Sequence, residues 1–315
     1  MNFDIVSSQE QVKACDLLIL GVGKEKAVQH SPRFQELAAT LGGQINTVFA
    51  AEQIDSFKEI TCIHTLGQFP AKRVLFVGLG QEKDLNMEKW RELIARITQE
   101  AIRYQAEKIG YCLDSFLVAN VEVERLAHLV AETTLLAAYR FDHYKTEKKE
   151  QEKVKLNQVT LYSEADREQL SSGLMTGEAY AIGTCLARDL VNTPGNLLTP
   201  TDLAAKAVEI AKRHQFDYTI LDRKEMEALG MGALLAVAQG SEQPPKMIVL
   251  KYQGLPEWDK VIGFVGKGLT FDTGGISIKP SAKMDEMKMD LGGAASVLGA
   301  MEVIGRLKPR CNVLA

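Results

Sequence analysis

The chain has 315 residues, a formal net charge of −4 at pH 7, and 46% hydrophobic and 25% charged residues. This composition is typical of a soluble globular protein, and the length suggests about two domains. The acidic balance argues against a protein dedicated to binding nucleic acid. The N-terminus lacks the basic and apolar regions of a signal peptide, and no stretch approaches the roughly 18 apolar residues of a membrane-spanning helix.

Cysteine and histidine residues are dispersed along the chain. The five cysteines occur singly, without a CxxC pair, so neither a disulfide framework nor a cysteine zinc site is indicated. We expect reduced thiols in a cytoplasmic protein. The five histidines do not form an HExxH helix. Any metal site must therefore be built mostly from oxygen ligands.

The first half of the chain alternates short apolar runs with amphipathic stretches. The apolar runs predict strands at residues 16–22, 45–50, 59–66, 73–78 and 156–162. Hydrophobic residues at helical spacing predict helices at residues 31–41, 84–108 and 121–144. This alternation indicates an α/β domain. We place its end near Ser163, after the charge run at residues 145–155, which gives two domains, residues 1–163 and 164–315.

Two glycine pairs follow predicted strands in this half, Gly21 with Gly23 and Gly78 with Gly80. Each pair could cradle a phosphate, but neither completes the GxGxxG pattern. A turn that needs positive φ explains each pair at least as well, and we favour the turn.

The second half predicts a bridging helix from residue 165 toward residue 190, and then a loop with the sequence RDLVNTPGNLLTP. Further helices are predicted at residues 203–214, 224–229 and 292–307, and strands at 217–221, 246–252 and 260–265. Residues 230–241 are rich in glycine and alanine, so we expect them to pack tightly near a site. Residues 311–315 start another apolar run, from which we infer a truncated chain, since a strand needs its following connection.

The most unusual segment is residues 265–293, VGKGLTFDTGGISIKPSAKMDEMKMDLGG, which is dense in charge and glycine. It follows an apolar run that predicts a fully buried strand, and ligands of open α/β sheets bind beyond the carboxyl ends of strands. Buried charges are costly unless they are compensated. A divalent cation bound by the acids could compensate them, and so could a network of Lys–Asp pairs.

Asp272 and Asp290 supply the hard oxygen ligands that suit a divalent cation, and Gly274-Gly275 lets the backbone bend so that they converge. Lys267 is near enough in sequence to share the site, either as a repelled cation or as a neutral nitrogen ligand. Two metal ions bridged by carboxylates would activate a water for hydrolysis. Residue types alone also allow a structural ion-pair network or a Schiff-base lysine.

The segment beginning VGKGLTFDTGGISIKP resembles the active-site entry of the leucyl aminopeptidase family, cytosolic dinuclear metallo-aminopeptidases that assemble as hexamers. The sequences RDLVNTPGNLLTP, LGMGALLAVAQGS and IVLKYQG also recur in that family in the same order. The resemblance implies a macrodomain-like N-terminal α/β domain. It also implies an α/β/α metallopeptidase catalytic domain that is incomplete in this chain.

The resemblance implies a role for each matching residue. Lys267 would ligate the more tightly held metal, Asp272 would bridge both metals and Asp290 would complete the first site. Lys279 would be the catalytic lysine that binds the substrate carbonyl, and Met287 would line the pocket for the first side chain of the substrate. The implied cofactors are two divalent ions, Mn²⁺ or Zn²⁺. The implied substrates are peptides with a free N-terminus, with a leucine-type preference, and the implied assembly is a homohexamer.

The chain departs from the family because it lacks the second acidic motif, Asn-Thr-Asp-Ala-Glu-Gly-Arg. We therefore expect this chain to be inactive or nearly so, and the parent protein to be the peptidase. Asp285, Glu286 and Lys288 are expected to be surface or supporting charges and not ligands. The alternative function is a non-enzymatic binding module, including DNA binding, through residues 1–163; we favour the enzyme because no basic stripe is evident.

Overall fold

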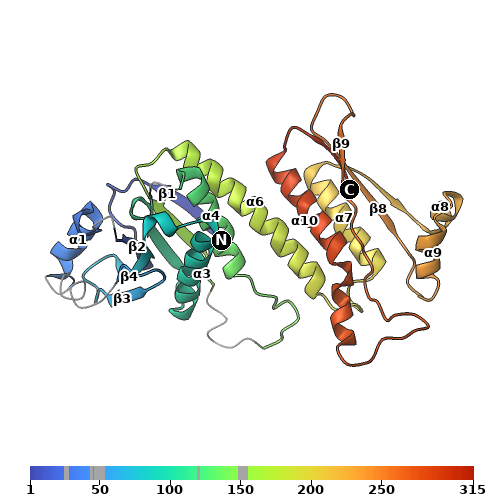
Figure 1. Cartoon of the computed structure of the whole chain (residues 1–315), viewed down its shortest axis with the longest axis horizontal. Helices are drawn as coiled ribbons and strands as arrows, with labels where there is room; N and C mark the ends of the chain where they lie inside the picture. Colours follow the sequence, from blue (N-terminus) through green and yellow to red (C-terminus); the bar gives the residue numbers. More distant parts are fainter. Residues whose placement is uncertain (25–27, 43–44, 46–53, 119–120, 148–154) are drawn as a thin grey trace. The chain divides into compact units, whose positions relative to one another are not determined.

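The chain forms two compact units, Met1–Glu178 and Ala179–Ala315, in a computed structural model (Figure 1). The structure describes residues 1–24, 28–42, 45, 54–118, 121–147 and 155–315. Helix α6 (Arg167–Asn192) begins in the first unit and ends in the second. It confirms the bridging helix that the sequence predicts.

The first unit contains a six-stranded sheet in the order β1-β6-β5-β2-β4-β3. Its neighbouring strands are parallel, except for the antiparallel pair of β3 and β4. The strands are β1 (Asn2–Val6), β2 (Cys15–Gly23), β3 (Ile60–His64), β4 (Ala71–Gly80), β5 (Lys108–Cys112) and β6 (Gln158–Tyr162). Short 3₁₀ turns lie at η1 (Val28–His30), η2 (Glu82–Asp84) and η3 (Leu113–Ser115).

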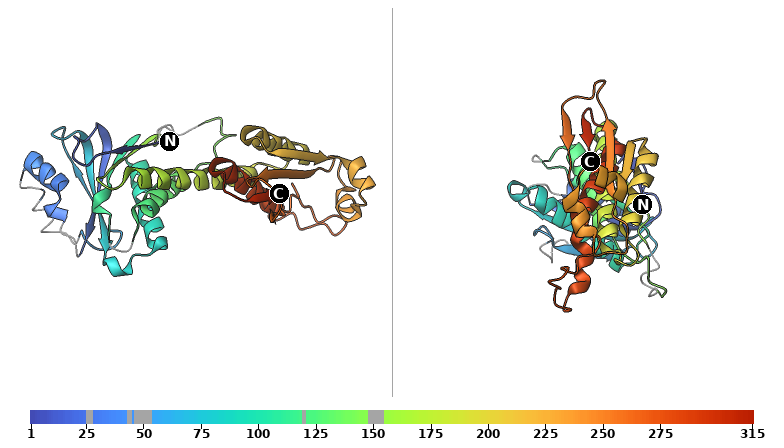
Figure 2. Two further views of the ribbon diagram at one scale, coloured as in Figure 1. Left: turned by 90° about the horizontal axis from the view of Figure 1, so that it is seen from above. Right: turned by 90° about the vertical axis from the view of Figure 1, so that its right-hand side faces the viewer.

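Helices cover both faces of this sheet (Figure 2). Helix α1 (Pro32–Leu41) packs on one face, and α3 (Met87–Arg103) and α4 (Val123–Ala137) pack on the other. Along β2, Leu17 and Ile19 belong to the core under α3 and α4, whereas Leu18 and Leu20 belong to the core under α1. A strand buried on both faces reads as a continuous apolar run, which is why the sequence predicts β2 correctly.

Most differences between the predicted and the observed helices and strands of the first unit concern the residues at which they end. The predicted helix 84–108 is too long, because Asn86 caps the start of α3 and the chain from Lys108 forms β5. The predicted helix 121–144 ends at Ala137. Strands β1 and β5 were not predicted, and their exposed or charged first residues weaken the apolar pattern. Of the predicted strand 45–50, all but Ile45 lies outside the described residues.

Three of the four backbone amides of the glycine pairs donate hydrogen bonds inside the fold. The amide of Gly21 donates to Ser115 Oγ at 2.8 Å, that of Gly78 to the carbonyl of Glu59 at 2.9 Å, and that of Gly80 to the carbonyl of Asp55 at 2.9 Å. Because these donors are occupied, they do not form a phosphate cradle. The turn interpretation holds for Gly80, whose φ is +71°.

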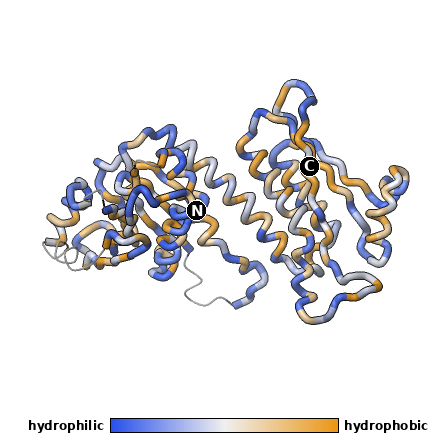
Figure 3. Tube along the Cα trace, in the orientation of Figure 1, coloured by the Kyte–Doolittle hydropathy of each residue, from blue (hydrophilic) through white to orange (hydrophobic). Residues whose placement is uncertain are grey.

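The second unit contains a four-stranded sheet in the order β7-β8-β10-β9. Strand β8 is antiparallel to both neighbours, and β10 is parallel to β9. The strands are β7 (Asp217–Leu221), β8 (Met247–Gln253), β9 (Val261–Gly263) and β10 (Asn312–Leu314). The helices are α7 (Pro200–His214), α8 (Arg223–Ala228), α9 (Gly232–Ala238) and α10 (Gly292–Leu307). Bands of hydrophobic residues recur along α7 and α10 (Figure 3), which build the core with the central strands β8 and β10.

Two burial predictions for the second unit are wrong. The strand predicted as fully buried is β9, an exposed edge strand, and Val265 just after it is 98% exposed. The reason is that β9 pairs only with β10, while the core lies over the central strands. The glycine- and alanine-rich stretch forms α9, which has no buried residue because it packs mainly against the short helix α8.

A buried carboxylate joins α7 to α10. Glu302 is 1% exposed, and its Oε1 accepts a hydrogen bond from Arg306 Nε at 2.8 Å. Its Oε2 lies 3.1 Å from Arg213 Nη1 and 2.9 Å from His214 Nε2 at the end of α7. Burial raises the pKa of Glu302, but the hydrogen bonds from His214 and Arg306 outweigh it and hold the pKa below its ordinary value.

Packing around this carboxylate requires glycine at position 305. A Cβ there would lie 2.2 Å from Cγ of His214. We expect Gly305→Ala to lower the free energy of unfolding of the second unit by about 1–3 kcal/mol, as overpacking of a filled core does. Urea unfolding followed by circular dichroism measures this change. The matched control is Gly240→Ala, where a Cβ meets nothing within 4 Å; an equal loss in both variants would contradict the packing argument.

The stability of the second unit should depend on pH through Glu302. Because its pKa is lower folded than unfolded, the ionised carboxylate stabilises the fold above the unfolded pKa of about 4.3. This contribution is lost as the pH falls through the folded pKa. We therefore expect the difference in the free energy of unfolding between wild type and Glu302→Gln to be largest near pH 7 and to shrink toward pH 3. Urea unfolding at each pH measures it, and the exposed Glu242→Gln should show no such trend.

Candidate metal centre

A tight loop follows β9 and brings Lys279 back to Asp272. Gly274 and Gly275 have φ values of +92° and +74°, a conformation that side chains with a Cβ rarely adopt. The amide of Gly274 donates to Asp272 Oδ1 at 2.9 Å, and the amide of Lys279 donates to the carbonyl of Thr273 at 2.9 Å. These two bonds close the loop between the carboxylate and the lysine.

The loop forms the first of two Lys–Asp pairs. Lys279 Nζ donates to Asp272 Oδ2 at 2.7 Å and also lies 2.9 Å from Met287 Sδ. The hydrogen bond from Lys279, followed by that from the Gly274 amide, lowers the pKa of Asp272 below its ordinary value. Asp272 is therefore held as a carboxylate.

The second pair joins the chain before the loop to the segment before α10. Lys267 Nζ donates to Asp290 Oδ1 at 2.7 Å. The amide of Ala294 donates to the carbonyl of Lys267 at 2.8 Å, and a Cβ on Gly293 would lie 2.8 Å from the Lys267 nitrogen. The start of α10 thus packs on the backbone that carries Lys267. The other carboxylate oxygen, Asp290 Oδ2, is buried and has no hydrogen-bond partner in the described part of the chain.

The two pairs are neighbours, because Met287, which contacts Lys279, and Asp290, which contacts Lys267, lie three residues apart in one 3₁₀ helix. The structure therefore brings together all five residues that the sequence nominated. They are Lys267, Asp272, Lys279, Met287 and Asp290. Their individual roles remain predictions.

The 3₁₀ helix η4 (Met284–Leu291) explains which of its residues reach the pairs. Side chains three positions apart eclipse each other in a 3₁₀ helix. Met287 and Asp290 share one row and contact the two lysines. Lys288 and the fully buried Leu291 share another row, while Glu286 lies on the exposed third row. The helix geometry thus separates Asp290 from the other charges of the same segment.

The donor set fits a divalent cation in part. Asp290 Oδ2, which has no hydrogen-bond partner among the described residues, is a site where a cation would be favourable; Asp272 adds an oxygen donor, and Lys267 would add a nitrogen donor after losing its proton. Three donors are fewer than the roughly four to six that such ions take. Over the residues that the structure describes, no group of three or more His, Cys, Asp or Glu side chains is placed to hold a metal.

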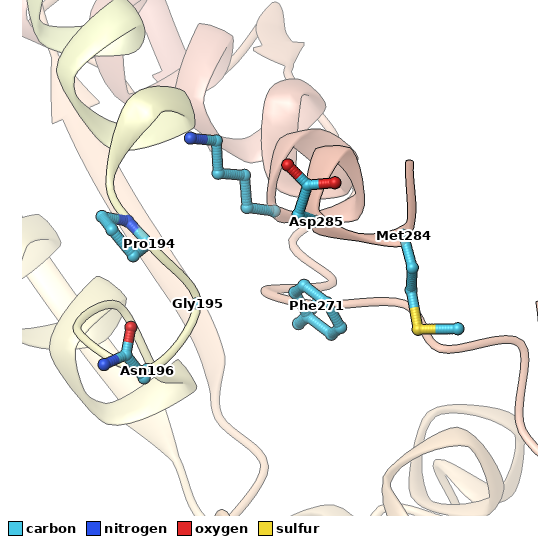
Figure 4. Close-up of a pocket in the computed structure, with 7 residues that line it drawn as sticks. Pro194, Gly195, Asn196, Phe271, Met284 and Asp285 are labelled. Atoms are coloured by element: carbon cyan, nitrogen blue, oxygen red, sulfur yellow. The ribbon is translucent and has the colours of Figure 1, made fainter. Parts of the chain in front are cut away.

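A pocket of about 650 Å³ lies beside this segment, between the loop after α6 and residues 271–288 (Figure 4). Its walls are Pro194, Gly195, Asn196, Phe271, Met284, Asp285 and Lys288. The sequence did not assign this pocket. The sequence feature that could have indicated the pocket is the NTPGN loop. Its forced turn brings the loop against the charged segment, from which it is distant along the chain.

Comparison with known proteins identifies the family to which this fold belongs. Residues 19–148 match the family model described as "Cytosol aminopeptidase family, N-terminal domain". Residues 185–315 match the model described as "Cytosol aminopeptidase family, catalytic domain". The chain belongs to this cytosol aminopeptidase family, which confirms the family that the sequence resembles.

Individual relatives agree with this assignment. A probable cytosol aminopeptidase of Alkaliphilus metalliredigens is 43% identical over all of this chain and 63% of the relative. The corresponding protein of Bacillus subtilis is 49% identical over 77% of this chain and 48% of the relative. The chain thus spans less than two thirds of the length of these curated relatives.

Solved structures share the fold. A mutant of tomato leucine aminopeptidase aligns with a TM-score of 0.79 and 26% identity, covering 100% of this chain and 61% of that chain. The bottromycin maturation enzyme BotP in complex with Mn aligns with a TM-score of 0.74 and 29% identity, covering 95% and 58%. These neighbours confirm the two-domain α/β class that the sequence predicts.

Loss of the Lys279 amine should change the titration of Asp272. We expect the pKa of Asp272 to rise in Lys279→Met, because the hydrogen bond that lowers it most is removed. Carbon-13 NMR of the aspartate carboxyl groups across an acid titration measures this shift. The exposed Lys283→Met is the control and should leave the titration unchanged. A pKa of Asp272 that stays low in Lys279→Met would contradict the pairing.

Proposed function

We propose that the protein to which this chain belongs is a metal-dependent aminopeptidase that releases N-terminal residues, leucine-type ones by preference, from peptides. The observation that carries the proposal is the juxtaposition of the two Lys–Asp pairs with the uncompensated oxygen of Asp290. Family membership supports a peptidase. We also propose a division into an N-terminal domain, residues 1–163, and a catalytic domain from residue 164.

We propose two divalent ions, Mn²⁺ or Zn²⁺, as cofactors, with Lys267, Asp272 and Asp290 as the residues of this chain that hold them. The complex of BotP with Mn supports the choice of a divalent ion. When bound, such ions polarise a carbonyl and make a water nucleophilic at neutral pH. A protonated amine cannot ligate a metal, so this role requires Lys267 to give up its proton and leave Asp290.

The remaining residues act on the substrate. Lys279 carries an ammonium group held in place by Asp272, and it is suited to donate a hydrogen bond to the carbonyl oxygen of the peptide. Met287 lies against Lys279 and supplies an apolar, adaptable wall for the first side chain of the substrate. The structural ion-pair network is the competing interpretation, since both lysines are paired with carboxylates.

We propose that the chain of 315 residues is inactive or nearly so by itself, because its three donors do not complete a dinuclear site. We further propose a homohexamer for the full-length protein, and a cytoplasmic location, which the name of the relatives supports. Among the described helices, none is long and apolar enough to cross a membrane.

The full-length protein should release leucine from an unblocked leucyl peptide or leucyl amide when Mn²⁺ or Zn²⁺ is supplied. We expect chelation to abolish the activity, and Asp272→Ala to lower kcat/KM by at least about 100-fold, because groups that only support metal ligands are already worth 10- to 100-fold. A colorimetric assay of amine release measures both effects.

Glu286→Ala is the matched control for this assay. Glu286 is an exposed carboxylate in η4, so its loss should leave kcat/KM nearly unchanged. Activity that survives chelation, or an Asp272→Ala variant as active as the control, would show that the pairs are only structural. An N-terminally acetylated peptide should not be cleaved.

A further inference from the structure

Lys288 and the loop that follows α6 support the candidate metal centre through contacts that do not involve its proposed ligands. We propose that Lys288, through the end of α6, and Gly195, through Phe271, are positioning residues that set the orientation of Asp290, Met287 and Asp272. The inference rests on the proposed function, because that function makes the site a metal centre. The contacts that carry the inference are independent of any metal.

The first contact joins η4 to the end of α6. Lys288 Nζ donates to the carbonyl of Asn192, the last residue of α6, at 3.2 Å. The last carbonyls of a helix lack partners within the helix and carry its negative dipole end, so a lysine there is favourable. The amide and the hydroxyl of Thr193 both donate to the backbone carbonyl of Asp189, the hydroxyl at 2.7 Å. The end of α6 is therefore a fixed anchor for the ammonium group of Lys288.

The second contact joins the same loop to the residue before Asp272. A Cβ on Gly195 would lie 2.9 Å from Cδ2 of Phe271, so the backbone of the loop lies directly on the phenyl ring. The carbonyl of Pro194 accepts the amides of Leu197 and Leu198 at 2.8 and 3.1 Å, which holds the loop in this shape. Glycine at position 195 is thus a requirement of close approach.

These two contacts together fix both halves of the site. In a 3₁₀ helix of three residues per turn, anchoring Lys288 fixes the rotation of η4 about its axis. That rotation directs Met287 toward Lys279 and Asp290 toward Lys267. Phe271, held by the loop, fixes the backbone on which Asp272 begins the glycine turn. Neither Lys288 nor Gly195 is a proposed ligand, so their effect is on geometry.

The test compares Lys288→Met with Lys288→Arg in this chain, using two measurements. Hydrogen–deuterium exchange read by mass spectrometry reports the order of residues 265–291, and electron paramagnetic resonance of free Mn²⁺ reports the Kd for that ion. We expect Lys288→Met to exchange faster in residues 265–291 and to bind Mn²⁺ about 10- to 100-fold more weakly, the effect of losing a group that orients a ligand. Lys288→Arg should restore both values, since a guanidinium can also donate to the carbonyl.

The matched control is Lys283→Met, an exposed lysine of the same segment that should change neither value. Gly195→Ala is the second variant, and it should accelerate exchange in residues 265–291 by displacing Phe271, while Gly240→Ala should not. Exchange in α7 should be unchanged in all of these variants, because a positioning role leaves the core intact.

The outcomes separate this inference from the proposed function. Unchanged exchange in residues 265–291 in Lys288→Met and Gly195→Ala overturns the positioning role, and so does acceleration spread equally over α7, which marks a general loss of stability. If the wild-type chain binds no Mn²⁺ while exchange responds as expected, the positioning role stands and the metal proposal is weakened. Weaker Mn²⁺ binding without faster exchange contradicts the route through the α6 anchor.

Discussion

The pairing of two aspartates with two lysines in one glycine-rich segment is the constraint on which the site depends. Asp272 and Asp290 each accept a lysine hydrogen bond at 2.7 Å, and the backbone turns around them serve to make these contacts. One oxygen of Asp290 remains buried without a partner among the described residues. A carboxylate oxygen that is buried without a partner is costly, and the proposed metal site would offset this cost by placing a cation there.

The fold places this segment by anchoring its two ends and its middle. The start of α10 packs on the backbone of Lys267, the glycine turn returns Lys279 to Asp272, and the loop after α6 holds Phe271 and Lys288. The Glu302 network then ties α10 to α7 within the same unit. The site is therefore connected to the core through α10, and a change in that packing can reach the candidate metal centre without touching a proposed ligand.

In both units, the sequence predicted the positions of helices and strands more correctly than the burial of their residues. Leu17 to Leu20 are apolar on both faces of β2, so this run predicted a central strand, and similar apolar runs predicted strands beside it. The short strands β1 and β5 were missed because a few residues with polar ends carry little periodic signal. The apolar run at β9 predicted a strand correctly and its burial wrongly, because edge position is a property of the whole sheet.

The sequence by itself determined the α/β class through local periodicity, and the resemblance of its motifs to a known family determined the family and the five candidate residues of the site. Only the tertiary structure decided how those residues pair, which row of η4 faces the lysines, and that Lys288 and Gly195 support them. It also decided that the amides of Gly21, Gly78 and Gly80 are occupied. The physical reason is that such contacts join residues distant along the chain, and side-chain pattern within a segment carries no record of the partner it will meet.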